Sequence, residues 1–132
     1  MIAVDTNVLV RLFVSDDPEQ TALVQGLIEN AIDAGTTCFV SAPVLCELEW
    51  VLASTYRASR TEVLAAIERL LEDPLFVFED RNVLLQALAA YRQSRAQFAD
   101  HLIGARAQAF GAETAWTFDR GLRNRAGFSI LG

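Results

Sequence analysis

The chain has 132 residues, 52% of them hydrophobic, and a formal net charge of −6 at pH 7. This length and composition predict a single domain, spanning residues 1–132, that buries a core of its own. All 11 basic residues are arginine, which excludes phosphate sites built on a lysine, such as the P-loop, and the acidic charge excludes sequence-blind coating of nucleic acid by a basic surface.

Neither a zinc-binding pattern nor a membrane segment is visible in the sequence. Cys38 and Cys46 lack CxxC spacing and His101 is the only histidine, which argues against a structural zinc site. No apolar run approaches the ~20 residues that a membrane-spanning helix needs, and the N-terminus does not resemble a signal peptide. We therefore expect a cytoplasmic protein with reduced thiols and no membrane association.

The predicted elements begin with a short apolar strand over residues 2–5. Residues 6–14 either extend that strand or form a short helix, and the Asp-Thr-Asn sequence at the break favours the helix. Asp17 and Pro18 begin a longer helix that runs to about residue 33. The apolar stripe of that helix is expected to comprise Leu23, Leu27, Ile28 and Ile32.

Strands and helices continue to alternate along the rest of the chain. The further expected strands are residues 37–40, 75–78, 113–118 and 128–131. The further expected helices are residues 41–56, 61–71, 81–94 and 99–110. This alternation predicts an α/β fold in which helices cover both faces of a parallel sheet, and ligands bind such sheets beyond the carboxyl ends of the strands.

Four acidic residues are candidates for that edge of the sheet. They are Asp5, Glu47, Asp100 and Asp119. Topology alone places three of them there, and Asp100 reaches it if its helix starts over the edge. Each alone is also explained as a helix cap, a partner of the helix dipole or a solvated side chain. Together they indicate more, because Asp5 ends a segment that we expect to be buried and because carboxylates held close together repel unless a cation lies between them.

The second acid has a rival two residues further along the same helix. The apolar stripe of that helix comprises Val44, Leu45, Leu48, Val51 and Leu52. Glu47 flanks one side of the stripe and Glu49 flanks the other, so the helical period does not choose between them.

The segments around the four acids resemble the four motifs of the PIN-domain family, in the same order and over nearly the whole chain. The matching segments are residues 4–9 (VDTNVL), 44–52 (VLCELEWVL), 98–103 (FADHLI) and 117–119 (TFD). The second motif selects Glu47 over Glu49. The length of the chain and the amino-acid sequences of the first two motifs are most similar to the VapC branch, the toxins of bacterial toxin–antitoxin pairs.

This resemblance implies a three-layer αβα domain with a five-stranded parallel sheet and endonucleolytic cleavage of RNA. It implies Mg²⁺ or Mn²⁺, bound directly or through water by Asp5, Glu47, Asp100 and Asp119. It also implies a homodimer and a VapB-like antitoxin partner. The residue types agree with this chemistry, because ligands that offer only oxygen suit a hard cation.

Several further residues are candidates with two readings each. Thr6, Asn7 and Thr117 either position a ligand or water, or serve as cap and turn residues. The arginines that are candidate contacts for the RNA backbone, or else part of a solvated surface, are Arg11, Arg120, Arg123 and Arg125. His101, beside Asp100, is not a required family residue and is expected to be solvated.

Three other functions stay open at this point. The chain is alternatively an RNA-processing PIN nuclease with no toxin role, or an inactive PIN-like module that binds RNA or protein. The third alternative is a metal-dependent phosphatase that acts on small molecules. The presence of all four acids argues against the inactive module.

Overall fold

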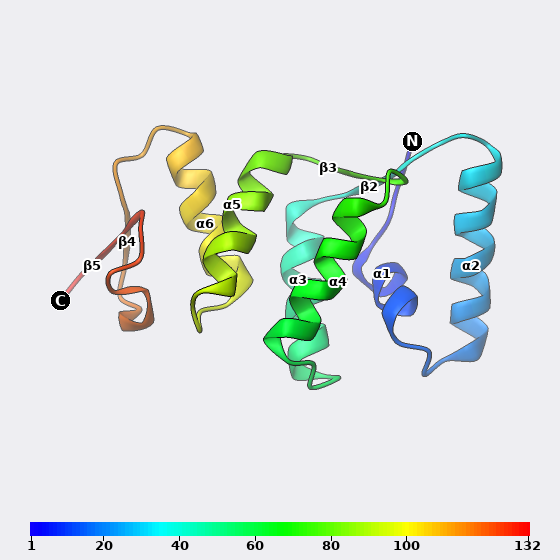
Figure 1. Cartoon of the computed structure of the whole chain (residues 1–132), viewed down its shortest axis with the longest axis horizontal. Coiled ribbons are helices and arrows are strands. Elements are labelled where there is room, and N and C mark those ends of the chain that lie inside the picture. The colour runs from blue at the N-terminus through cyan, green and yellow to red at the C-terminus, as the bar shows by residue number, and fades with distance from the viewer. The chain divides into compact units, whose positions relative to one another are not determined.

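The computed structural model describes residues 1–132, which separate into two compact units, Met1–Glu79 and Asp80–Gly132 (Figure 1). Both units contain helices and strands, and every strand pairing is parallel. The predicted α/β class is therefore confirmed. None of the helices combines the length and the apolar character needed to cross a membrane.

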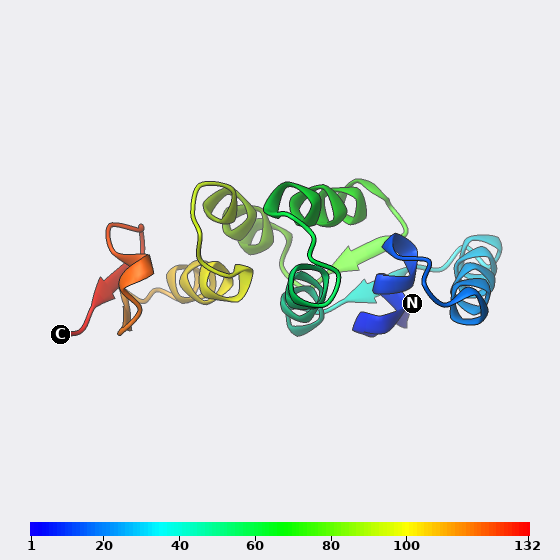
Figure 2. The same cartoon turned by 90° about the horizontal axis from the view of Figure 1, so that it is seen from below.

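The first unit is built on a three-stranded sheet of order β1-β2-β3. Its strands are β1 (Ile2–Ala3), β2 (Cys38–Val40) and β3 (Phe76–Phe78). Its helices are α1 (Thr6–Phe13), α2 (Pro18–Asp33), α3 (Ala42–Ser54) and α4 (Arg60–Glu72). Figure 2 shows β2 and β3 as neighbouring arrows, and their register pairs Val40 with Phe78. The three strands run in the same direction, so α1 and α3 both begin at the edge where β1 and β2 end.

The core of the first unit lies between these strands and helices. Its most completely buried side chains include Leu9, Val10, Val40, Leu48 and Ile67. Helix α1 packs against α2 and α3, and α3 packs against α4, as Figure 1 also shows. Full burial of a side chain such as Leu48, in the middle of α3, stabilises the fold by roughly 1.5–3 kcal/mol.

The second unit consists of a helical hairpin followed by a two-stranded sheet. Its elements are α5 (Arg81–Arg92), α6 (Phe98–Ala109), β4 (Ala115–Thr117), the short 3₁₀ helix η1 (Arg120–Leu122) and β5 (Phe128–Ile130). The rings of Tyr91 and Phe98 meet edge to face with their centroids 6.0 Å apart at the turn of the hairpin. Ala115 pairs with Phe128 in the parallel β4-β5 ladder.

One feature of the predicted fold is not observed. The five strands do not form one sheet, because hydrogen bonds pair them as a three-stranded and a two-stranded sheet. Each strand is only two or three residues long, so few ladder hydrogen bonds are made, and β1 and β4 each pair with a single neighbour.

The predicted apolar stripe of α2 is also wrong in part. Leu23, Leu27 and Ile32 are exposed, whereas Val24 and Ala31 are buried. The apolar residues of this helix cover a wide arc of its surface, and only the middle of that arc packs on the unit.

We predict that Gly104 of α6 cannot accept a larger side chain without cost. A Cβ at this position would lie 2.6 Å from Cε2 of Phe128. Gly104→Ala should therefore lower the free energy of unfolding by about 1–3 kcal/mol, the usual cost of overpacking. A Cβ at Gly26 of α2 meets nothing within 4 Å, so Gly26→Ala should raise it by about 0.5–1 kcal/mol. Urea unfolding of both variants measures the difference, and equal changes would contradict the close approach.

Candidate active site

Asp5 stands between β1 and α1 and caps that helix. Its Oδ1 accepts a hydrogen bond from the Thr6 backbone N–H at 2.7 Å. Asp5 itself is exposed, so the expectation that its carboxylate is buried is wrong; burial ends at Val4, which is 6% exposed. The second carboxylate oxygen of Asp5 makes no hydrogen bond within the protein. One oxygen is thus fixed by the backbone and the other is open to a ligand.

Helix α3 exposes Glu47 and buries Glu49, which is 5% exposed. The buried face of this helix comprises Ala42, Leu45, Leu48, Glu49 and Leu52. Compared with the predicted stripe, the helix is rolled so that the Glu49 side turns inward. Of the two rival acids, only Glu47 presents a carboxylate that a ligand can reach.

Burial also affects the thiol between these two acids. Burial, and then the charge of Glu49, raise the pKa of the Cys46 thiol. The protonated form of Cys46 therefore predominates at neutral pH, and in this form a thiol reacts slowly.

The two acids of the second unit, like Asp5, each accept a hydrogen bond from a backbone N–H near the start of a helix or turn. Asp100 lies in the first turn of α6, where its Oδ2 accepts a hydrogen bond from the Gln97 N–H at 3.1 Å. Asp119 follows β4, and its Oδ1 accepts from the Gly121 N–H at 2.8 Å. The Thr117 hydroxyl accepts in turn from the Asp119 N–H at 3.0 Å. Both carboxylates thus have one oxygen held by a backbone N–H.

The four acids divide two and two between the units. Asp5, Asp100 and Asp119 all have the cap or turn role that the sequence left open beside metal binding. No group of three or more His, Cys, Asp or Glu side chains is arranged to hold a metal ion. The donor chemistry nevertheless fits Mg²⁺ or Mn²⁺, because each of these carboxylates keeps an oxygen without a hydrogen bond and such cations bind oxygen ligands.

Among the auxiliary candidates, Thr6 is unusual. It is 2% exposed, and its hydroxyl has no hydrogen-bond partner, although a buried polar group is normally paired. Asn7 is exposed on α1. Thr117 supports the backbone of Asp119, which is its turn role rather than a contact with a ligand.

The candidate RNA-contacting arginines differ in whether their guanidinium groups already have partners within the protein. The Arg11 guanidinium forms an ion pair with Asp16 and donates to the Tyr56 hydroxyl at 3.1 Å. These two hydrogen bonds raise the pKa of Arg11, and its guanidinium is already occupied. Arg120 and Arg123 are exposed and have no carboxylate partner, so they are better placed to meet a phosphate.

His101 is not the solvated side chain that the sequence predicts. It is 3% exposed, and its Nε2 is hydrogen-bonded to the Ser94 hydroxyl at 2.7 Å. The ring also meets Tyr91 edge to face. The hairpin of α5 and α6 buries this side of α6, which a period count on α6 alone does not reveal.

Comparison with known proteins adds to this geometry. The model of the PIN domain family matches residues 2–127. The chain belongs to the PIN domain family. It is similar to a VapC ribonuclease of Aquifex aeolicus (strain VF5), with 27% identity over 131 residues, which are 99% of this chain and 96% of that protein.

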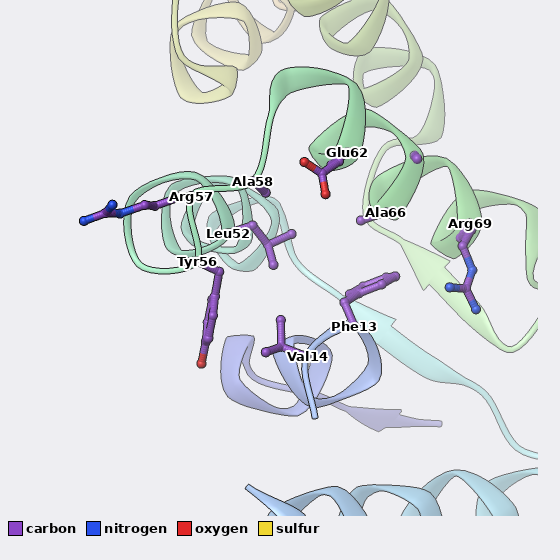
Figure 3. Close-up of a pocket in the computed structure, with 10 residues that line it drawn as sticks. Phe13, Val14, Leu52, Tyr56, Arg57, Ala58, Glu62, Ala66 and Arg69 are labelled. Carbon is purple, nitrogen blue, oxygen red and sulfur yellow. The ribbon is translucent and has the colours of Figure 1, made fainter. Parts of the chain in front are cut away.

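The match to the PIN domain includes all four acids and extends over most of both compact units. The first unit contains a cavity of about 510 Å³. Figure 3 shows its lining, in which Phe13, Val14 and Leu52 are apolar and Arg57 and Arg69 are cationic. None of the four PIN-motif acids lines this cavity.

We predict opposite effects from removing two buried hydroxyls. Thr6→Val removes a hydroxyl that has no partner, so without metal its urea midpoint should equal or exceed that of the wild type. Ser94→Ala removes the partner of His101 Nε2 and of the Ala96 N–H, which should cost about 1–3 kcal/mol. A destabilised Thr6→Val variant would show that the Thr6 hydroxyl is bonded in solution.

Proposed function

We propose that this chain is an endoribonuclease of the VapC type, which hydrolyses RNA phosphodiester bonds with Mg²⁺ or Mn²⁺. The observation that supports the proposal most is how the motif acids are oriented and exposed. Asp5, Asp100 and Asp119 are each oriented by one backbone N–H and keep one oxygen without a hydrogen bond, while Glu47 is exposed. The similarity to a VapC ribonuclease over nearly the full length of both chains supports the choice of RNA as substrate.

In this proposal the two compact units act together as a single nuclease domain. Asp5 and Glu47 of the first unit and Asp100 and Asp119 of the second would hold the metal ion. The match of one PIN domain to residues 2–127, across the boundary between the units, supports this. Glu49 is excluded from the ligand set because it is buried.

The remaining side chains offer little else for hydrolysis. A bound divalent ion supplies an activated water at neutral pH and offsets the charge of the phosphate. The only histidine, His101, is buried and bonded to Ser94, and the chain has no lysine, so a histidine-based mechanism without metal has no general base. In this proposal the four carboxylates hold and orient the metal ion. Arg120 and Arg123 bind the RNA backbone, and Arg125 is a further contact.

We propose the same partners as for a toxin of this type. The partners are the RNA substrate, a second copy of the chain in a homodimer, and a VapB-like antitoxin that holds the enzyme inactive in the cytoplasm. The similarity to a VapC ribonuclease supports the toxin role over that of an RNA-processing enzyme.

The first functional prediction concerns the metal and the acids. RNA cleavage should need Mg²⁺ or Mn²⁺, stop in EDTA and return when metal is added. Asp5→Asn, Glu47→Gln, Asp100→Asn and Asp119→Asn should each lower cleavage by more than the roughly 10–100-fold that loss of an outer-sphere partner costs. Glu49→Gln should have a mild effect, and Glu29→Gln, an exposed position on α2, should have none.

Three results would contradict this proposal. Full cleavage in excess chelator would exclude the metal mechanism. Inactivation by Glu49→Gln with an active Glu47→Gln would exclude the choice of Glu47. Hydrolysis of nitrophenyl phosphate by a protein that leaves RNA intact would favour a small-molecule phosphatase instead.

The second functional prediction concerns how an acidic protein binds a polyanion. With a net charge of −6, the chain as a whole repels RNA, so only a few local cations contribute. Loss of each phosphate contact should reduce the slope of log affinity against log salt by roughly 0.7–0.9. Arg120→Ala/Arg123→Ala should weaken binding of an uncleavable RNA and lower the slope, with metal affinity unchanged. Parallel salt titrations for the variant and the wild type would place the RNA elsewhere.

A further inference from the structure

The start of α3 is capped in a way that differs from most helices of this chain. The side chain of the N-cap residue itself caps α1, α2, α4 and α5, from Asp5, Asp17, Ser59 and Asp80. At α3 the N-cap residue is Ser41, and its side chain makes no capping hydrogen bond. The Ala42 N–H donates instead to Oε1 of Glu79, which follows β3. A carboxylate from a distant part of the sequence thus replaces the local cap.

The parallel sheet explains why Glu79 reaches this position. Val40 and Phe78 are partners in the β2-β3 register, so the next residues, Ser41 and Glu79, leave the sheet side by side at the same edge. Pro43 in the first turn has no N–H to satisfy. Ala42 is 8% exposed, so its N–H is largely shielded from water and benefits from a partner inside the protein.

The roll of α3 is weakly specified by its own sequence. Glu47 and Glu49 lie on opposite flanks of the apolar stripe, and the structure buries one and exposes the other. Glu47 lies five residues after Ala42 on the same helix. Because the helix turns as a unit, a rotation of its first turn about the helix axis also moves the Glu47 carboxylate.

We propose that Glu79 is a positioning residue of the active site. By holding the Ala42 N–H at the end of β3, its carboxylate fixes the roll of α3 that exposes Glu47 and buries Glu49. This inference rests on the proposed function, in which Glu47 is a metal ligand. Glu79 does not touch the metal or the RNA in this role.

The test compares two variants at this position with a control. Glu79→Gln keeps an oxygen that accepts from the Ala42 N–H, whereas Glu79→Ala removes it. Glu29→Ala, at an exposed position of α2 with no hydrogen bond to its side chain, is the control for loss of one negative charge. Mn²⁺ affinity is measured by titration calorimetry on the full chain, without RNA.

We expect Glu79→Ala to weaken Mn²⁺ binding by about tenfold, the typical effect of losing a residue that orients a ligand. Glu79→Gln should bind Mn²⁺ nearly as well as the wild type, and Glu29→Ala should be unchanged. Equal losses in Glu79→Gln and Glu79→Ala would show that Glu79 acts through its charge, as a ligand, and would overturn the positioning role.

A second readout follows the roll itself without metal. Cys46 is half-buried next to Glu47, and Cys38 is fully buried in β2. A roll of α3 that brings Glu49 outward also brings Cys46 outward, so Glu79→Ala should make Cys46 react faster with a thiol reagent while Cys38 stays protected. Equal acceleration at both cysteines would mean general loosening of the fold and would overturn the inference.

The outcomes separate this inference from the proposed function. A wild-type protein that binds no Mn²⁺ would overturn both. A wild type that binds Mn²⁺, with Glu79→Ala binding equally well, would overturn the positioning role alone.

Discussion

The N–H groups in the first turn of a helix have no carbonyl partner within that helix, and much of this structure follows from how they are satisfied. Carboxylates do most of this work, from Asp5, Asp17 and Asp80 at their own helices and from Glu79 at α3. A capping carboxylate uses one oxygen and keeps its charge and its second oxygen. A helix that starts after a strand can therefore be capped by a carboxylate that still has one oxygen available to a ligand, as Asp5 shows at α1.

Under the proposed function, capping and metal binding are therefore not alternatives, because one carboxylate can serve in both roles. At Asp5 the backbone bond to Thr6 limits the freedom of the side chain before any ligand arrives. A ligand that is already oriented loses less conformational entropy when it binds. Under the proposed function, the cap would therefore favour metal binding by Asp5, and mutation to a neutral residue would affect both roles.

Signals within one segment of the sequence predicted the helices and strands well. Contacts between segments that are distant in the sequence could not be predicted in this way. Asp17 before Pro18 marked the start of α2 correctly, because a cap and its helix are neighbours in sequence. At α3 the neighbouring N-cap residue Ser41 makes no capping bond, and Glu79 caps the helix through the pairing of β2 with β3. The same limit explains His101, which α5 covers. The positions of the four motif acids in the elements could be predicted, but their exposure and partners depend on packing that no single segment encodes.

The close approach of α6 to β5 links two positions that are distant in sequence. Gly104 has no room for a side chain because the Phe128 ring occupies that space. A related chain with a larger residue in place of Gly104 would need a smaller one in place of Phe128, or a strand further from the helix. These two positions should therefore change together during evolution, and grafting either residue alone from a relative would introduce a steric mismatch that the paired exchange avoids.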